Sequence, residues 1–211
     1  MSIDGSDVQP NGAPVNSIPR RRQGTEIAEA GLAAIEAAMK TGQLHVTTPT
    51  EREIVMTRIF AAPRTAVFDA LTRPELLKCW CYGPDGWSMV DCEVDLRVGG
   101  TYRFVLRGTD GTRMGLGGVY REVVPPERIV NTEVFDQDWT GGETVATTVL
   151  EEEGGKTTLT STVRYSSKEA RDAALKSGML RGAGASYDRL EELLVSAAAR
   201  GSRREAREPR A

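Results

Sequence analysis

The 211-residue sequence has little cysteine and no long apolar run. Its three cysteines, Cys79, Cys81 and Cys92, are too few for the disulfide framework of a small secreted domain, and their number is odd. No stretch of about 18 apolar residues occurs, and the N-terminus lacks the basic and then apolar order of a signal peptide. We therefore expect a cytoplasmic protein with no membrane span.

Histidine is almost absent, which limits the chemistry that the chain can carry. A single histidine, His45, leaves no histidine-dependent triad and no histidine-rich metal site. The cysteines lack the second ligand pair of a structural zinc site, so they are interpreted as buried or partly buried thiols. The pairs Gly99–Gly100 and Gly117–Gly118 do not precede a helix, which phosphate binding requires, and are interpreted as bends and bulges of a curved sheet. We predict no metal and no cofactor.

No excess of charge of one sign marks the whole chain. Lysine and arginine total 27 against 30 acidic residues, a net charge of −3 that gives no reason to expect nucleic acid as the main partner. Residues 200–211 are locally basic, with five arginines against two glutamates. We interpret them as a disordered, solvated tail, the alternative being attraction to nucleic acid or membrane.

The N-terminal 45 residues differ in composition from the rest. Residues 1–24 have almost nothing to bury, which predicts disorder. Residues 25–40 are rich in alanine and glutamate at helical spacing, and they predict a short helix within this extension. Residues 46–199 then form the predicted domain, ahead of the basic tail.

The predicted domain has an unusual order of elements. A strand over 52–60 precedes two short helices, the first beginning near Pro63 and the second running from Pro74 toward Trp80. Segments separated by turn residues then predict six antiparallel strands, 87–96, 101–107, 113–123, 127–135, 143–151 and 156–165. A long helix over about 167–197 carries an apolar stripe that needs a concave sheet to lie on. The fold class is therefore α+β, in the order β-α-α-β6-α with seven strands.

Within the long helix, three glycines stand out. Gly178, Gly182 and Gly184 each cost about 1 kcal/mol relative to alanine in a helix interior. They predict a bend, a close backbone approach, or room for a bound molecule, and the sequence leaves these alternatives open.

Four segments in this order carry a family resemblance. They are Met56–Ala70 (MTRIFAAPRTAVFDA), Gly83–Trp87 (GPDGW) after Trp80, Cys92–Gly100 (CEVDLRVGG) and Gly118–Val130 (GVYREVVPPERIV). Together they resemble the START-like SRPBCC superfamily, and within it the bacterial members of the family named after the activator of the heat-shock-protein-90 ATPase.

The resemblance covers roughly residues 39–197 and implies a helix-grip fold, as in the birch-pollen allergen. In that fold a curved antiparallel sheet grips the long C-terminal helix around an internal apolar cavity. Residues 1–38 lie outside the resemblance, and we expect them to be dispensable.

Aromatic residues make up only 6% of the chain, yet they gather in the segments that such a fold places around one cavity. Together with small or flexible residues of the long helix they predict a pocket of flat apolar surfaces with hydroxyl groups, although aromatics are more often simply core. The predicted cavity residues are Trp80, Trp87, Tyr102, Phe104, Tyr120, Asn131, Glu133, Met179, Ala183 and Tyr187.

Glu133 is the carboxylate of most interest. Strand 127–135 has apolar groups on both faces, so alternation alone does not say whether Glu133 and Asn131 face the cavity or the surface. A buried carboxyl would be paired or would meet the polar end of a ligand, and its pKa would be raised. No catalytic residue is assigned, with Glu133 and Tyr120 as the candidates.

Three functions follow from these observations. The first is binding of a small hydrophobic or amphipathic molecule, lipids included, without catalysis. The second is an enzyme of the cyclase, dehydratase or hydrolase type, with Glu133 and Tyr120 or Tyr102 as proton carriers. The third, suggested by the family name, is a chaperone-interacting protein. The oligomeric state, monomer or homodimer, stays open.

Overall fold

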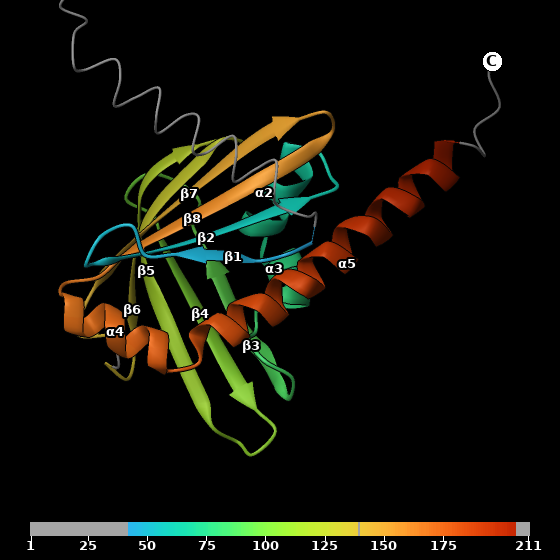
Figure 1. Ribbon diagram of the computed structural model, residues 1–211. Helices are drawn as coiled ribbons and strands as arrows, with labels where there is room; N and C mark the ends of the chain where they lie inside the picture. Colours follow the sequence, from blue (N-terminus) through green and yellow to red (C-terminus); the bar gives the residue numbers. More distant parts are fainter. Residues whose placement is uncertain (1–41, 139, 206–211) are drawn as a thin grey trace, which may run out of the picture. The chain divides into compact units, whose positions relative to one another are not determined.

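The described part of the chain contains one sheet and four helices (Figure 1). The structure is a computed structural model that describes residues 42–138 and 140–205. The strands are β1 (His45–Thr47), β2 (Glu53–Phe60), β3 (Trp87–Val94), β4 (Thr101–Gly108), β5 (Arg113–Val124), β6 (Arg128–Phe135), β7 (Thr144–Glu153) and β8 (Lys156–Arg164). The helices are α2 (Arg64–Thr72), α3 (Pro74–Trp80), α4 (Lys168–Lys176) and α5 (Met179–Glu205).

The strands pair in the order β1-β2-β8-β7-β6-β5-β4-β3, all antiparallel. After β2 the chain crosses through α2 and α3 to the far edge of the sheet, where β3 begins. Six consecutive strands then return, until β8 pairs with β2 and places Met56 opposite Ser161. This arrangement confirms the predicted α+β helix-grip fold.

The prediction of seven strands was wrong by one. His45–Thr47 pairs with β2 and makes an eighth strand at the edge of the sheet. Three residues are too few to show the alternation by which a strand is recognised in a sequence, and these fall at the predicted boundary between extension and domain. The disorder and the helix predicted for residues 1–41 lie outside the described residues.

The single long helix of the prediction is two helices. Gly178 has a φ of +83°, a left-handed conformation that favours glycine, and it separates α4 from α5. Gly182 lies where a side chain would come 3.5 Å from the Pro84 ring, so the helix approaches the 83–84 loop closely. Both the predicted bend and the predicted close approach are therefore present. Helix α5 runs on to Glu205, past the predicted domain end at 199, and the remaining tail lies outside the described residues.

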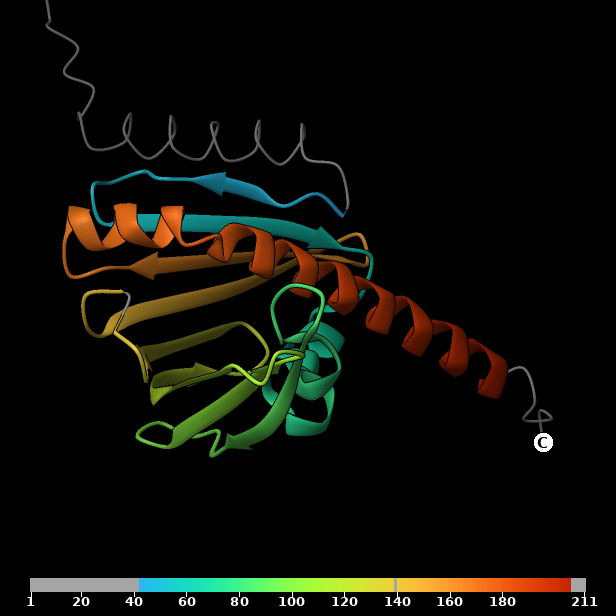
Figure 2. The same cartoon turned by 90° about the horizontal axis from the view of Figure 1, so that it is seen from below.

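The first part of helix α5 lies alongside the sheet, and its C-terminal part extends beyond the strands (Figure 2). An apolar stripe of the helix faces the core. Tyr187, Leu190 and Leu194 of this stripe are buried in the main core. A buried cation also lies between β2 and α5. Arg58 of β2 is 2% exposed and forms ion pairs with two carboxylates of α5, Asp188 at 2.7 Å and Glu191 at 2.6 Å. Side chains from β2 thus fix the position of α5 over the sheet.

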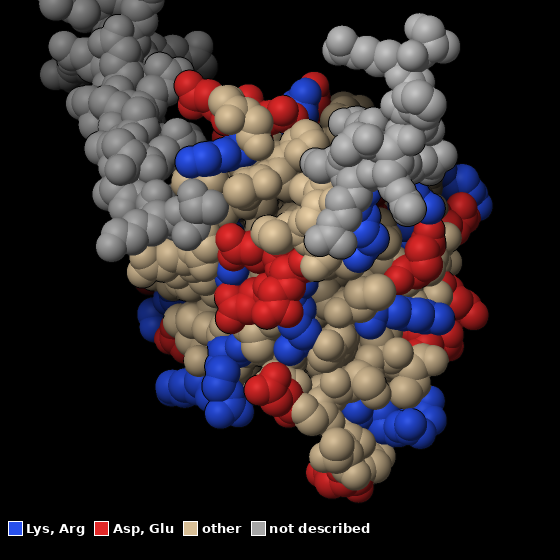
Figure 3. All heavy atoms as spheres, turned by 90° about the vertical axis from the view of Figure 1, so that its right-hand side faces the viewer, with Lys and Arg blue, Asp and Glu red and all other residues tan. Residues whose placement is uncertain are grey.

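The surface carries charges of both signs. On the face seen in Figure 3, lysine and arginine side chains are interspersed with aspartate and glutamate. Among the residues that the structure describes, no helix is long and apolar enough to cross a membrane.

Candidate functional site

Two adjoining chambers lie between the sheet and α5. The first has a volume of about 300 Å³ and the second about 530 Å³. Seven residues line both: Cys81, Phe104, Glu133, Val163, Met179, Ala183 and Ser186. The second chamber is also lined by Tyr82, Gly83 and Pro84 from the loop after α3, and by Ser177–Ala183 around the start of α5 except Leu180.

Nine of the ten residues predicted to line a cavity line the first chamber. They are Trp80, Tyr102, Phe104, Tyr120, Asn131, Glu133, Met179, Ala183 and Tyr187. The tenth, Trp87, lines only the second chamber, because it begins β3 beside the loop after α3. The structure therefore brings these residues together, while their role toward a ligand stays a prediction.

Glu133 faces the cavity, which the sequence left undecided. Ile129, Asn131 and Glu133, at alternate positions of β6, all line the first chamber. The opposite face holds Val134, which is exposed. Within the described residues, the Glu133 side chain has no hydrogen bond and no ion pair, so the carboxyl group lies in the cavity wall without a partner.

Burial raises the pKa of Glu133 to about 7, because the surrounding protein disfavours the charged form. The charge of Glu133 acts on its neighbours in turn. Burial first and this charge second raise the pKa of Tyr165 to about 12, and they also raise that of Tyr102. Near neutral pH, Glu133 is thus the group in the cavity that changes its charge.

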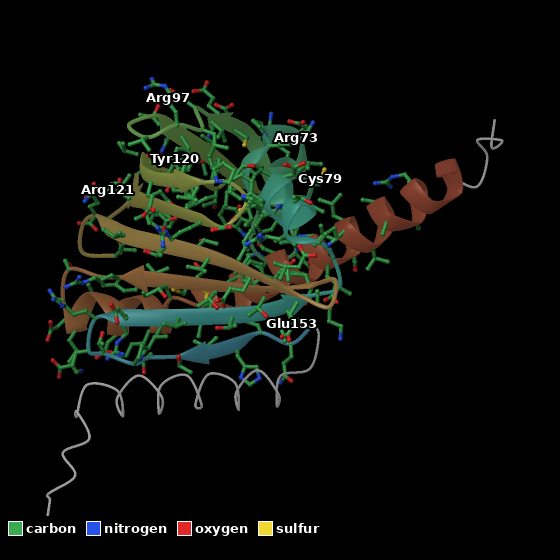
Figure 4. The ribbon with its side chains drawn as sticks, turned by 90° about the horizontal axis from the view of Figure 1, so that it is seen from above. Arg73, Cys79, Arg97, Tyr120, Arg121 and Glu153 are labelled. Atoms are coloured by element: carbon green, nitrogen blue, oxygen red, sulfur yellow. The ribbon has the colours of Figure 1, made fainter. Side chains whose placement is uncertain are left out.

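The hydroxyl of Tyr102 is fully engaged beside Glu133. It donates a hydrogen bond to the carbonyl oxygen of Thr132 at 2.8 Å and accepts one from Asn131 Nδ2 at 2.9 Å. The centroid of its ring lies 5.3 Å from that of Tyr120. Tyr120 is buried, at 5% exposure, whereas the next residue, Arg121, reaches the surface (Figure 4). Tyr102 therefore supports the chamber wall, and its proton is committed to the backbone.

Trp80 and Tyr187 form the wall on the helical side. Their rings stack with centroids 6.1 Å apart, and Trp80 Nε1 donates to the carbonyl oxygen of Ala70 at 2.9 Å. The indole N–H is thus satisfied within the protein, so a ligand would meet these rings as flat apolar surface.

The prediction missed lining residues on β2, β7 and β8. They include Met56, Ala146, Thr148, Ser161 and Val163, and Cys81 after α3 was also missed. The signal was present in part, because Ser161 and Val163 share a face with Leu159 in an alternating strand. Which strands face one another across the cavity, however, depends on the pairing of β2 with β8, which a local pattern does not encode.

The cysteines differ in environment. Cys79 is exposed on α3 (Figure 4), whereas Cys92 is buried. Burial, with the charge of Glu133, raises the pKa of Cys81 to about 12. Among residues 42–138 and 140–205, no group of three or more His, Cys, Asp or Glu side chains is placed to hold a metal ion.

We expect iodoacetamide at about pH 8 to alkylate Cys79 at least about tenfold faster than Cys81 or Cys92, because the thiolate is the reactive form and Cys81 is held protonated. Peptide mass spectrometry at several times measures the three rates. Equal rates in urea serve as the control for peptide detection. Fast alkylation of Cys81 in the folded protein would contradict the raised pKa of this half-buried thiol.

The chain is similar in sequence and fold to known proteins. The family model for activator of Hsp90 ATPase homolog 1-like proteins matches residues 61–195. A crystal structure of a protein from Rhodobacter sphaeroides is 32% identical, covering 73% of this chain and 99% of that one, with a TM-score of 0.69. A protein from Nitrosomonas europaea is 28% identical over 72% and 99% of the two chains, with a TM-score of 0.64. No curated protein matches the chain.

Proposed function

Since the chain belongs to the family of activator of Hsp90 ATPase homolog 1-like proteins, a branch of the START-like SRPBCC superfamily, we propose that it binds a small amphipathic molecule in the two chambers under α5. One observation carries this proposal. An unpartnered carboxyl group, that of Glu133, lies in a wall that is otherwise mainly aromatic and aliphatic.

The carboxyl group of Glu133 favours a bound ligand for an energetic reason. Glu133 is half-buried, and withdrawing a carboxyl group from water without a hydrogen bond in exchange costs free energy. Groups of this kind gather at sites that act on something else. The chamber volumes of about 300 and 530 Å³ lie within the range of small-molecule sites, which are mostly apolar with a few polar groups that orient the ligand. An apolar body against Trp80 and Tyr187 and a polar end at Glu133 satisfy both parts of this wall.

Filling the cavity tests the proposal. Ala183 of α5 lines both chambers, so Ala183→Phe is expected to weaken binding of the neutral apolar dye Nile red at least about tenfold, as measured by fluorescence titration. Ala197→Phe, an exposed position on the same helix, is the matched control and is expected to bind like the wild type. Equal binding by the two variants would place the dye outside the chambers.

Native against denaturing mass spectrometry of freshly purified protein adds a direct reading. A non-covalent adduct that denaturation releases would give the mass of the natural ligand. Its absence from the Ala183→Phe variant, with retention in Ala197→Phe, would assign it to the chambers.

A second candidate function is acid–base catalysis, favoured by the pKa of about 7 at Glu133. The structure limits the proton carriers, because the Tyr102 proton is held by the Thr132 carbonyl oxygen, which leaves Tyr120 as the candidate tyrosine. An adduct that wild-type protein converts over time and Glu133→Gln holds unchanged would favour this function. The chaperone-interacting role rests on the family name alone and carries no proposal here.

A further inference from the structure

We propose that the polar end of the ligand is a cation, a protonated primary or secondary amine, that pairs with the carboxylate of Glu133. This inference rests on the proposed function and adds the chemical class of the ligand. It follows from which charges and which hydrogen-bond donors the cavity wall contains.

The charges in the wall are unbalanced. Among the described residues that line the first chamber, Glu133 alone is acidic, and none is lysine, arginine or histidine. Among the described residues, the second chamber adds one cation, Arg181, which is an exposed residue in the first turn of α5. An anionic ligand, such as a fatty acid, would therefore bring its charge toward Glu133 in a chamber with no cation to receive it.

Three hydrogen-bond donors near Glu133 are used by other groups. Tyr102 donates to the Thr132 carbonyl oxygen, and Asn131 Nδ2 donates to Tyr102 Oη. The Tyr165 hydroxyl contacts the Met179 sulfur at 3.3 Å. Cys81, the remaining titratable neighbour, offers only a weak thiol donor. None of these groups donates a hydrogen bond to Glu133, and an ammonium group supplies both a donor and the opposite charge.

Pairing of this kind couples binding to a proton. Around neutral pH the empty site holds Glu133 partly protonated, because its pKa is about 7. A primary alkylamine, like a lysine side chain, stays charged up to a pH of about 10. When it binds, the carboxyl group loses its proton, so the affinity for an amine rises with pH between about 6 and 8, and binding at the lower pH releases close to one proton per site.

Three probes that share an alkyl chain and differ in their polar group test the inference. They are octylamine, octanol and octanoate, titrated by isothermal calorimetry. We expect octylamine to bind at least about tenfold tighter than octanol at about pH 8, and octanoate to bind weakest. Glu133→Gln is expected to remove the preference for the amine while keeping the affinity for octanol. Titration at about pH 6 in two buffers of different ionisation enthalpy counts the released proton.

Two control variants sharpen the test. Glu93→Gln changes an exposed carboxylate on β3, the edge strand of the same sheet, and is expected to keep the amine preference. Arg181→Gln removes the single cation of the second chamber and is expected to leave octylamine affinity unchanged or slightly higher.

The outcomes separate this inference from the proposed function. If octanol binds as tightly as octylamine, and Glu133→Gln changes neither, the cation is excluded while the cavity stays a binding site. Tightest binding by octanoate, lost in Arg181→Gln, would also overturn the inference and move the polar contact to Arg181. If none of the probes binds and Nile red is not taken up, the proposed function fails together with this inference.

Discussion

Glu133→Gln is expected to stabilise the protein by up to about 3 kcal/mol at about pH 8 and to leave its stability nearly unchanged at about pH 4. The folded state raises the pKa of Glu133 from 4.5 to about 7, so between these values the native protein binds more protons than the unfolded chain. The free energy of unfolding of the wild type therefore falls as the pH rises from about 4.5 to about 7. The glutamine side chain does not titrate, so the variant does not lose this stability.

Urea unfolding at about pH 4, 5, 6, 7 and 8 measures this difference. Glu93→Gln, at an exposed position of β3, is the matched control and is expected to change stability by less than about 0.5 kcal/mol at every pH. A stability gain in Glu133→Gln that does not depend on pH would show that the carboxylate is solvated or paired, and it would remove the observation on which the proposed function rests.

Gly118→Ala is expected to destabilise the protein by about 3 kcal/mol or more. A side-chain carbon at this position would lie 1.9 Å from the carbonyl oxygen of Thr132 on β6. That oxygen also accepts the hydrogen bond of Tyr102, and the Thr132 hydroxyl accepts one from the Val119 backbone N–H at 3.2 Å. Relief of the clash therefore requires β5 and β6 to separate beside the cavity.

Thermal and urea unfolding of Gly118→Ala measure the loss. Gly184→Ala is the matched control, because the nearest atom to a side-chain carbon there is Leu44 Cδ2 at 3.9 Å and the residue lies inside α5. The free energy of unfolding of Gly184→Ala is expected to rise by up to about 1 kcal/mol, since alanine has a higher helix propensity than glycine. A Gly118→Ala protein as stable as the wild type would mean that the two strands are not in close contact at this point.

Both predictions depend on β6, and they show where sequence reasoning reached its limit. The six strands from β3 to β8 were predicted within a few residues, because turn residues separate short segments of alternating character. The inward face of β6 was not predicted, since both of its faces contain apolar side chains. The neighbouring strands decide it, by placing Asn131 opposite Tyr120 and Ala146.

The prediction of the C-terminal helices from the sequence was limited in a similar way. The stripe that includes Tyr187, Leu190 and Leu194 predicted a helix packed on the sheet, and these residues are buried there. The break at Gly178 was one of three alternatives that the sequence offered. A glycine inside a helical pattern is compatible with each of them, and only its backbone angle in the folded chain, with φ at +83°, selects the bend.

The sequence by itself determined the order of elements and the fold class, because these depend on local periodicity and on turn chemistry. The resemblance to a known family added ten of the residues that gather around the cavity. The tertiary structure decided that the cavity has two chambers and that Glu133 lies in the wall of both, without a partner among the residues that the structure describes. Pairing and charge balance depend on side chains from β2, β4, β6, β8 and α5 together. Their relative positions are set by strand register and helix packing, which no single segment encodes.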